Sequence, residues 1–303
     1  MQIIEGTTEF NLDGEYAIAI GKFDGIHRGH QKLIDIIRDL KQQGCKAAVF
    51  TFDPSPAAFF GDGTYKGLTT RDEKRRIFAK LGVDVLVEYP LNKESAAISP
   101  EEFIEKMLIR NMHVKYIVCG PDLTYGDRGK GNVALLQEYG KSHNFEIIIC
   151  DKVKVGDVEI SSSLIREEVE HGQMEKVCEH IGAPYSVTGI VRKGNQIGRT
   201  IGLPTVNLIP ESDKLLPPFG VYKAMVSYKG NHYKGITNIG IKPTVTTEGM
   251  ITVETNLMDF DEDIYGETII VNLMTFMRPE RRFDSTEELR LQIESDIRRA
   301  YED

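Results

Sequence analysis

The residues best suited to chemistry lie in the stretch GKFDGIHRGH, residues 21–30, where two histidines stand three residues apart among glycines. An apolar run, 16–20, precedes this stretch, and an amphipathic helical pattern follows it. Backbone N–H groups at the start of such a helix point outward, and the helix dipole favours an anion there. Histidines at this spacing share one side of the first helical turn. The stretch therefore predicts a nucleotide-phosphate site in which His27 and His30 donate to phosphate oxygens.

Two other interpretations of the histidine pair stay open at this point. In the first, both are surface residues at a helix start, and Asp24 caps the helix. In the second they bind a metal ion, although no further His or Cys lies nearby in the sequence to complete a ligand set. The phosphate hypothesis instead assigns them to the negative charge that develops on a leaving pyrophosphate.

Three further segments fit the phosphate hypothesis. The loops 51–56 and 120–126 each follow an apolar strand-like run, and loops at that edge of a parallel sheet face the ligand. The third segment, SSSLIR at 161–166, offers serines that can cap a helix and places Arg166 in its first turn. A helix start normally favours acidic residues, so an arginine with its fork of donors indicates an anion to be bound.

The second half carries a different candidate, GRTIGLPTVN at residues 198–207. No Walker A sequence occurs in the chain, so a role in phosphate transfer here cannot depend on a P-loop. From the residues alone, a glycine-rich barrel loop followed by a strand is an equally good interpretation. The acidic run 259–263 is interpreted as a solvated turn rather than a metal site.

The elements that must position these residues change in character along the chain. Up to about residue 182, short apolar strands alternate with helices that have good start signals, such as the capping boxes at Thr70 and Ser99. This alternation predicts a parallel sheet covered by helices on both faces. The expected strands are 16–20, 46–52, 83–89, 115–119 and 145–150.

A hinge is expected at 181–184, and the pattern after it is that of an antiparallel barrel or sandwich. Lys229-Gly230-Asn231 predicts a hairpin turn, and a final helix is expected behind Ser285. The expected strands of this part are 185–191, 221–228, 232–239, 251–258 and 267–276.

Bulk properties narrow the class of protein. The chain has 303 residues, 41% of them hydrophobic, and a net charge of −9 with no basic block, which argues against nucleic acid as the main partner. Its four cysteines form no C-x-x-C pair and are expected to be buried thiols in a reducing compartment. Neither a signal peptide nor a membrane-length apolar run is present, so we expect a cytoplasmic protein without a membrane partner.

The motifs together resemble the bacterial bifunctional riboflavin kinase/FMN adenylyltransferase (FAD synthetase) family. In the first half the resemblance depends on G-x-F-D-G-x-H-x-G-H, T-F-D-P-x-P, G-x-D-x-x-x-G and S-S-x-x-I-R. In the second half, residues 202–207 are similar to a G-x-P-T-A-N motif with Val206 in place of Ala, and N-I-G-x-x-P-T and R-P-E-x-x-F follow. The resemblance implies a doubly wound α/β nucleotidyltransferase domain at 1–182. It also implies a six-stranded antiparallel β-barrel (flavokinase) with a C-terminal helix at 183–303.

The resemblance also assigns residues to roles, with riboflavin, FMN and ATP as ligands and Mg²⁺ as the cofactor. Glu254 becomes the base that takes the proton of the riboflavin 5′-hydroxyl, and His27, His30 and Arg166 become the catalytic groups of adenylyl transfer. Thr205 and Asn207 are expected to hold Mg²⁺ with the ATP phosphates. The expected ATP-binding residues are Gly21, Phe23, Asp24, Gly25, His27, Gly29, His30, Ser162, Ser163, Arg166, Gly198 and Thr205. The expected flavin-binding residues are Asp53, Asp122, Asn207, Glu254 and Arg278.

Some positions depart from the family pattern. Ser55 stands where the family usually has His, Leu123 and Tyr125 where it often has Phe, Ser163 where it has Thr, and Asn256 where many members have His. Two alternatives therefore stay open: an enzyme in which only the kinase half is active, and a non-catalytic flavin- or RNA-binding regulator. The oligomeric state is left open as well.

Overall fold

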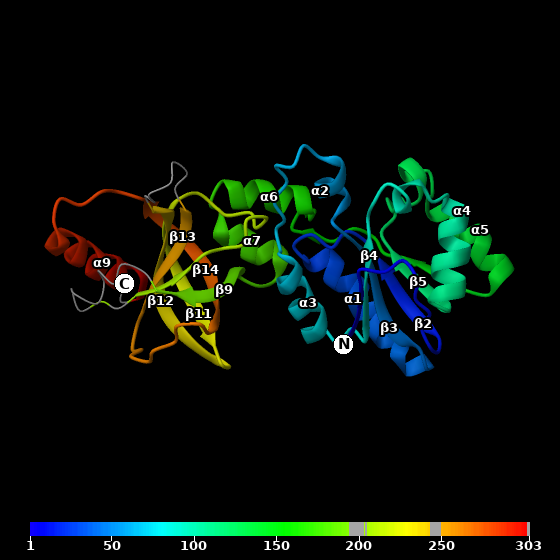
Figure 1. The fold of residues 1–303 in the computed structure, drawn as a ribbon, viewed down its shortest axis with the longest axis horizontal. Helices are drawn as coiled ribbons and strands as arrows, with labels where there is room; N and C mark the ends of the chain where they lie inside the picture. Colours follow the sequence, from blue (N-terminus) through cyan, green and yellow to red (C-terminus); the bar gives the residue numbers. More distant parts are fainter. Residues whose placement is uncertain (194–202, 204, 243–249, 302–303) are drawn as a thin grey trace. The chain divides into compact units, whose positions relative to one another are not determined.

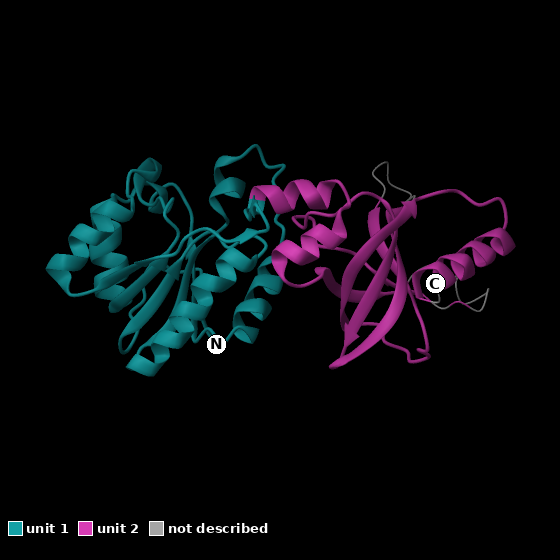
Figure 2. Ribbon diagram, turned by 180° about the vertical axis from the view of Figure 1, so that it is seen from behind, with its two compact units in different colours: residues 1–162 teal, residues 163–303 magenta. Residues whose placement is uncertain are grey.

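The structure, a computed structural model, describes residues 1–193, 203, 205–242 and 250–301. It contains two compact units, Met1–Ser162 and Ser163–Asp303 (Figure 2). Helices α6 (Ser162–Glu170) and α7 (Met174–Ile181) lead into the second unit, where α7 packs against strands of the barrel. The domain boundary after residue 182 was expected from a change of pattern along the chain, and it stays a prediction.

The first unit is built on a six-stranded parallel sheet with the strand order β1-β4-β3-β2-β5-β6 (Figure 1). The chain adds strands on one side of β2 and then returns to its other side, so the order reverses between β2 and β5. Such a switch point is where parallel sheets bind ligands. The strands are β1 (Gln2–Glu5), β2 (Tyr16–Ile20), β3 (Lys46–Asp53), β4 (Val85–Pro90), β5 (Val114–Cys119) and β6 (Glu146–Ile149).

Helices cover both faces of this sheet, as the alternation of elements predicted. Ala17 and Ala19 of β2 pack toward α1 and α3, whereas Ile18 and Ile20 pack toward η3 and α5. The expected strands of this sheet are present within a few residues, and of its six strands only the short edge strand β1 was not predicted. The main helical segments are α1 (Arg28–Asp39), α3 (Arg71–Lys80), the π-type segment η3 (Phe103–Asn111) and α5 (Val133–His143).

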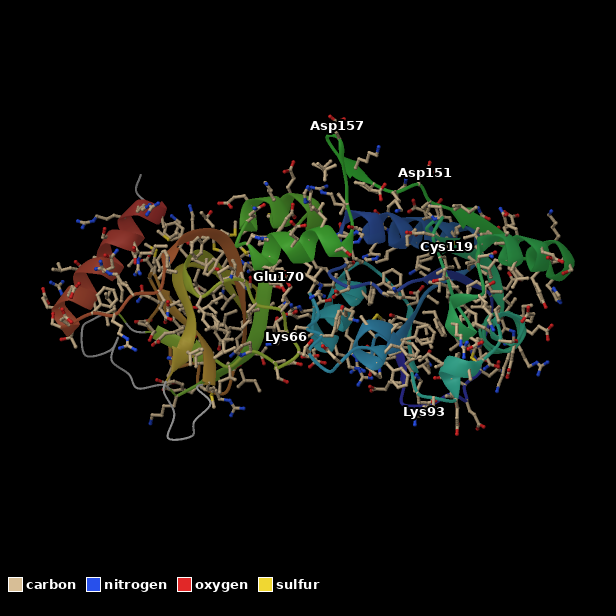
Figure 3. All side chains as sticks on the ribbon, turned by 90° about the horizontal axis from the view of Figure 1, so that it is seen from above. Lys66, Lys93, Cys119, Asp151, Asp157 and Glu170 are labelled. Atoms are coloured by element: carbon tan, nitrogen blue, oxygen red, sulfur yellow. The ribbon has the colours of Figure 1, made fainter. Side chains whose placement is uncertain are left out.

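Local signals explain where these helices begin and end. Thr70 Oγ1 accepts from the Glu73 backbone N–H, and the Glu73 carboxylate accepts from the Thr70 N–H, so the predicted capping box is complete. Ser99 caps α4 (Pro100–Glu102) by accepting from the Glu102 N–H at 3.1 Å. Shorter segments connect the main elements: η1 (Leu40–Gln43), α2 (Pro56–Phe60), η2 (Ser95–Ala97), η4 (Asp127–Gly129), β7 (Lys154–Val155) and β8 (Val158–Glu159). Strands β7 and β8 form a hairpin that projects with Asp157 at its tip (Figure 3).

The second unit contains a closed antiparallel barrel with the strand order β10-β13-β12-β11-β14-β9. Tyr222, Ala224 and Val226 line its interior and are fully buried. The expected hairpin turn joins β11 to β12, with positive φ at Lys229 and Gly230. Its strands are β9 (Tyr185–Arg192), β10 (Thr205–Leu208), β11 (Gly220–Tyr228), β12 (Asn231–Lys242), β13 (Met250–Leu257) and β14 (Thr268–Pro279).

Helix α9 (Thr286–Tyr301) closes the described chain and packs against the barrel. Ser285 accepts from the Glu288 N–H at 3.1 Å, as its position predicted. The other end of the helix is held by Tyr301, whose hydroxyl lies 2.5 Å from the Ala224 carbonyl oxygen and 3.1 Å from that of Gly235. The predicted fold class, a doubly wound parallel-sheet domain followed by a six-stranded barrel with a C-terminal helix, is therefore confirmed.

Candidate active sites

The first candidate site is the turn between β2 and α1, called the phosphate loop here and defined as residues 21–30. His27 occupies the N-cap position of α1, and its ring stacks on that of His30 with centroids 3.8 Å apart. The Phe23 ring packs on the His30 ring, with centroids 5.1 Å apart. Both histidines therefore stand at the start of a helix at the carboxyl edge of the sheet, as predicted.

The backbone of the phosphate loop is held in an unusual conformation. Phe23 (φ 51°) and Ile26 (φ 40°) adopt positive φ values although both are buried non-glycine residues. Gly25 (φ 81°) also has positive φ, and a Cβ there would lie 2.9 Å from Leu68 Cδ1. A Cβ at Gly29 would lie 3.1 Å from the His27 ring. These glycines let the chain turn tightly beneath the histidines, and strain of this kind concentrates at functional sites.

The electrostatics of the histidine pair differ from a simple cationic site. Burial lowers the pKa of His27 to about 4, and burial together with the neighbouring His27 lowers the pKa of His30 well below its usual 6.5. Both rings are therefore neutral at pH 7 without a ligand. The Nδ1 atom of each is buried and has no hydrogen-bond partner within the described part of the chain. Buried polar atoms normally have partners, so this pair is suited to a ligand that supplies one.

The N-cap position of α1 belongs to His27 and not to Asp24. Its carboxylate accepts from the Tyr65 hydroxyl at 2.8 Å and from the Leu68 backbone N–H at 2.7 Å, which fastens the segment 65–68 to the phosphate loop. The Asp24 carbonyl oxygen accepts from the Ser162 hydroxyl at 2.9 Å. Ser162 is thus brought to the loop across 138 residues, as its predicted role in the same site requires. Ser163 and Arg166 follow in α6 and belong to the second unit, so their predicted phosphate contacts stay predictions.

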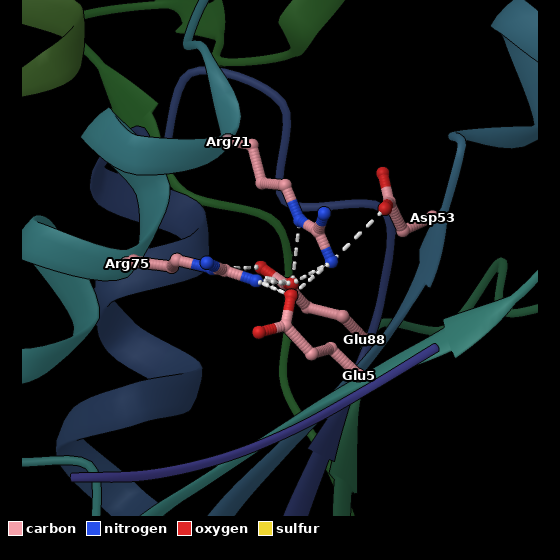
Figure 4. A network of polar contacts seen from close by, with 5 residues as sticks. All are labelled: Glu5, Asp53, Arg71, Arg75 and Glu88. Atoms are coloured by element: carbon pink, nitrogen blue, oxygen red, sulfur yellow. Dashed lines mark hydrogen bonds and ion pairs between the residues drawn. The ribbon is translucent and has the colours of Figure 1, made fainter. Parts of the chain in front are cut away.

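Asp53, expected to bind flavin, lies in a network of charged side chains (Figure 4). Its carboxylate is 3.2 Å from Arg71 Nη2, and Arg71 and Arg75 both bind the buried Glu88 and the more exposed Glu5. The three carboxylates of the network come from β1, β3 and β4, so the network ties one edge of the sheet to α3. The network holds Asp53 in place at the ligand edge, while its flavin contact stays a prediction.

The loop after β5 carries Asp122, a second expected flavin residue. Its side chain is exposed and lies 3.4 Å from Lys152 Nζ. Tyr125 in the same loop is buried, packs on Phe103 and donates to the Asn132 carbonyl oxygen at 3.2 Å. Tyr125 therefore packs in the interior of the loop. Its difference from the usual Phe of the family changes the interior of the loop rather than its exposed surface.

The second candidate site is a row of polar residues across strands β10, β13 and β12, called the polar row here. Asn207 lies opposite Glu254, and Glu254 lies opposite Asn238. Directly opposite residues of an antiparallel pair point to the same face. Val253 and Thr255 beside Glu254 are fully buried in the barrel, so the polar row lies on its outer face. The Thr205 hydroxyl donates to the Glu254 carboxylate at 2.9 Å, so three predicted kinase residues meet here.

Arg278, the last expected flavin residue, extends the same row. It pairs with Val221 of β11, which in turn pairs with Asn238. Its guanidinium forms an ion pair with Asp296 of α9, with Nη2 and Oδ2 2.8 Å apart. Gly198, expected to bind ATP, lies outside the described residues.

Sequence reasoning missed Asn238 and Asp296. Asn238 was quoted only within a matching motif, and strand register shows that it is a neighbour of Glu254. Asp296 had a detectable signal, because it lies on the helix face marked by Leu289, Ile293 and Ile297. A carboxylate on such a face needs a cationic partner, and Arg278 is that partner.

The fold and the two sites define a two-unit class of enzyme, with a nucleotidyltransferase-like sheet followed by a kinase-like barrel. Comparison with known proteins agrees with this class. Residues 10–164 match the family model described as FAD synthetase, and residues 181–302 match the model described as riboflavin kinase. The chain belongs to the bifunctional riboflavin kinase/FMN adenylyltransferase family.

Similar proteins span nearly the whole chain. The bifunctional riboflavin kinase/FMN adenylyltransferase of Listeria monocytogenes is 34% identical, covering 96% of this chain and 93% of its own length. The protein of the same name from Bacillus subtilis is 36% identical over 93% of this chain and 90% of its own. A solved structure described as a macrolide-efflux protein from Streptococcus pneumoniae has a TM-score of 0.85 at 30% identity, covering 97% and 96% of the two chains. Among the residues described for the present chain, no helix has the length and apolar character needed to span a membrane.

Proposed function

We propose that this chain phosphorylates riboflavin to FMN in its barrel and adenylylates FMN to FAD in its parallel-sheet unit. The observation that carries the proposal is the contact of Thr205 with Glu254, beside Asn207, on the outer face of the barrel. A hydroxyl, an amide and a carboxylate in one row suit both a magnesium–nucleotide complex and a general base.

In the kinase step, Glu254 orients the riboflavin 5′-hydroxyl and takes its proton as the oxygen attacks the γ-phosphorus of ATP. The new bond joins the 5′-oxygen to phosphorus, the bond to the β,γ-bridging oxygen breaks, and ADP leaves. Thr205 and Asn207 offer oxygen atoms of the kind that Mg²⁺ prefers, so they are the residues proposed to hold it. When bound, Mg²⁺ neutralises charge on the phosphates.

In the adenylyl step, a phosphate oxygen of FMN attacks the α-phosphorus of ATP, and pyrophosphate leaves. FMN is already an anion, so this step needs donors that offset repulsion and no base to remove a proton. The neutral His27 and His30 donate to the phosphates at the start of α1, and Ser162 anchors the phosphate loop. We propose that Ser163 and Arg166 of α6 complete the phosphate contacts, and that Asp53 and Asp122 face the flavin.

A pair of variants separates the two activities. Glu254→Gln should abolish FMN formation from riboflavin and spare FAD formation from supplied FMN, because only the kinase step needs a base. His30→Ala should abolish FAD formation from supplied FMN and spare FMN formation from riboflavin. Chromatographic separation of flavin products after incubation with ATP and Mg²⁺ measures both reactions. If Glu254→Gln still makes FMN at the wild-type rate, the role of Glu254 is wrong, and an absence of FAD from the wild type would favour the kinase-only alternative.

The acidic net charge and the polar row argue against a regulator that binds RNA. We propose that the protein acts in the cytoplasm on small flavins, without a membrane or nucleic-acid partner.

A further inference from the structure

Helix α9 contributes one buried charge to the side of the barrel that carries the polar row. Asp296 is 3% exposed, and it is the only buried residue of this helix among those the structure describes. A buried carboxylate is costly unless it is paired, so the contacts of Asp296 show what the helix is positioned to hold.

Those contacts converge on one guanidinium. Arg278 Nε lies 3.2 Å and 3.1 Å from the two Asp296 oxygens, and Nη2 lies 2.8 Å from Oδ2. Gln292, one helical turn earlier, donates to Asp296 Oδ1 at 2.8 Å. The Phe283 ring lies 5.9 Å from the guanidinium carbon. The fork of Arg278 is therefore fixed in position and orientation by groups outside the strand that carries it.

Arg278 in turn lies at the end of the polar row that contains Glu254. Strand register runs from Glu254 to Asn238, then through Val221 to Arg278. Asn238 also donates to the Glu280 carboxylate at 3.0 Å, and a Cβ at Gly240 would collide with that carboxylate. The segment immediately after Arg278 is thus seated on the strand that carries Asn238.

We propose that Asp296 is a positioning residue of the riboflavin kinase site, acting by holding Arg278 in the orientation that binds flavin. This inference rests on the proposed function, because it takes Arg278 as a flavin contact. It assigns α9 a role in substrate binding in addition to its packing on the barrel. Gln292 donates to the same carboxylate and contributes to the positioning of Arg278 to a smaller degree.

The helix itself offers a matched control. Tyr301 docks α9 on the barrel through bonds to the backbone of Ala224 and Gly235, and none of these bonds involves Arg278. Tyr301→Phe removes docking bonds, whereas Asp296→Asn removes the charge that holds Arg278 and keeps the side-chain shape. A purely structural role for Asp296 would make the two variants behave alike.

The experiment measures riboflavin Kd by fluorescence quenching, KM and kcat for FMN formation, and FAD formation from supplied FMN. Asp296→Asn should raise Kd and KM for riboflavin about tenfold, equivalent to about 1.4 kcal/mol, with kcat within about twofold. Tyr301→Phe should lower the melting temperature and leave Kd and KM unchanged. Adding Asp296→Asn to Arg278→Lys should have little further effect, because both changes act through one guanidinium.

Unchanged riboflavin Kd and KM in Asp296→Asn would overturn the inference, as would effects that add fully in the double variant. If Asp296→Asn does not fold, Gln292→Ala is the second test, and it should raise the Kd about threefold with FAD formation retained. A Gln292→Ala variant with wild-type Kd would then overturn the inference. Wild-type protein that binds no riboflavin would overturn the proposed function itself, which the binding measurement distinguishes from failure of the Asp296 role alone.

Discussion

Replacing His27 with glutamine should flatten the pH dependence of the first unit's stability between pH 7 and pH 4. His27 is 7% exposed, and burial lowers its pKa from 6.5 to about 4. Above pH 6.5 the His27 ring is neutral in both the folded and the unfolded chain, so its titration does not reduce the free energy of unfolding there. As pH falls, the unfolded chain takes up the proton first, and the free energy of unfolding decreases until pH falls through about 4.

The magnitude follows from the size of the displacement. Each pKa unit is worth about 1.4 kcal/mol. The free energy of unfolding of the wild type should therefore fall by about 3 kcal/mol through His27 between pH 7 and pH 4. His27→Gln cannot take up that proton and should lose correspondingly less. The buried His30 contributes a loss of the same sign in both proteins. Because the neighbouring His27 helps to lower the pKa of His30, the loss through His30 should also be smaller in His27→Gln, which flattens the pH dependence further in the same direction.

Hydrogen exchange followed by mass spectrometry in increasing urea is the suitable assay, because it follows peptides of β2 and α1 separately from the barrel. His143→Gln, which removes an exposed histidine at the end of α5, controls for the loss of a histidine as such. A difference between wild type and His27→Gln that stays constant from pH 7 to pH 4 would refute the reasoning.

Two further predictions concern the framework of the first unit. Gly25→Ala should destabilise this unit by about 2 kcal/mol in urea titrations and slow FAD formation, because of its positive φ and the Leu68 side chain 2.9 Å from the new Cβ. FMN formation should not change. In the charged network, Arg75→Met should lower the free energy of unfolding by about 2 kcal/mol and Arg71→Met by about 1 kcal/mol. The first loss is larger because Arg75 is the less exposed partner of the buried Glu88. Equal losses in the two variants would contradict this ranking.

The sequence was sufficient for the parts of the fold that local signals determine. The strand, turn and helix around His27 and His30 followed from hydrophobic pattern and glycine spacing, and the capping boxes correctly located helix starts at Thr70 and Ser99. Strand β1 was missed because four residues at a sheet edge carry no alternating pattern.

The parts that could not be predicted depend on contacts between distant residues. The neutrality of the histidines depends on burial, which only the folded loop provides. Asp53 is held by Arg71, and nothing in the spacing of these residues indicates that pair. Asn238 becomes a neighbour of Glu254 only through strand register, because β12 and β13 are paired in space. The motif resemblance singled out Glu254 and Thr205 without indicating these supporting partners.

The bond from Ser162 to the Asp24 carbonyl has a consequence for synthesis of the chain on the ribosome. It joins residues separated by 138 positions, so the phosphate loop emerges long before its last anchor. At typical translation rates the interval is on the order of ten seconds. During that time the strained segment Phe23–Ile26 lacks a native contact, while the sheet beside it is still gaining strands. The phosphate loop of the first unit therefore receives this anchor only as the nascent chain passes from the parallel sheet into the segment that leads to the barrel.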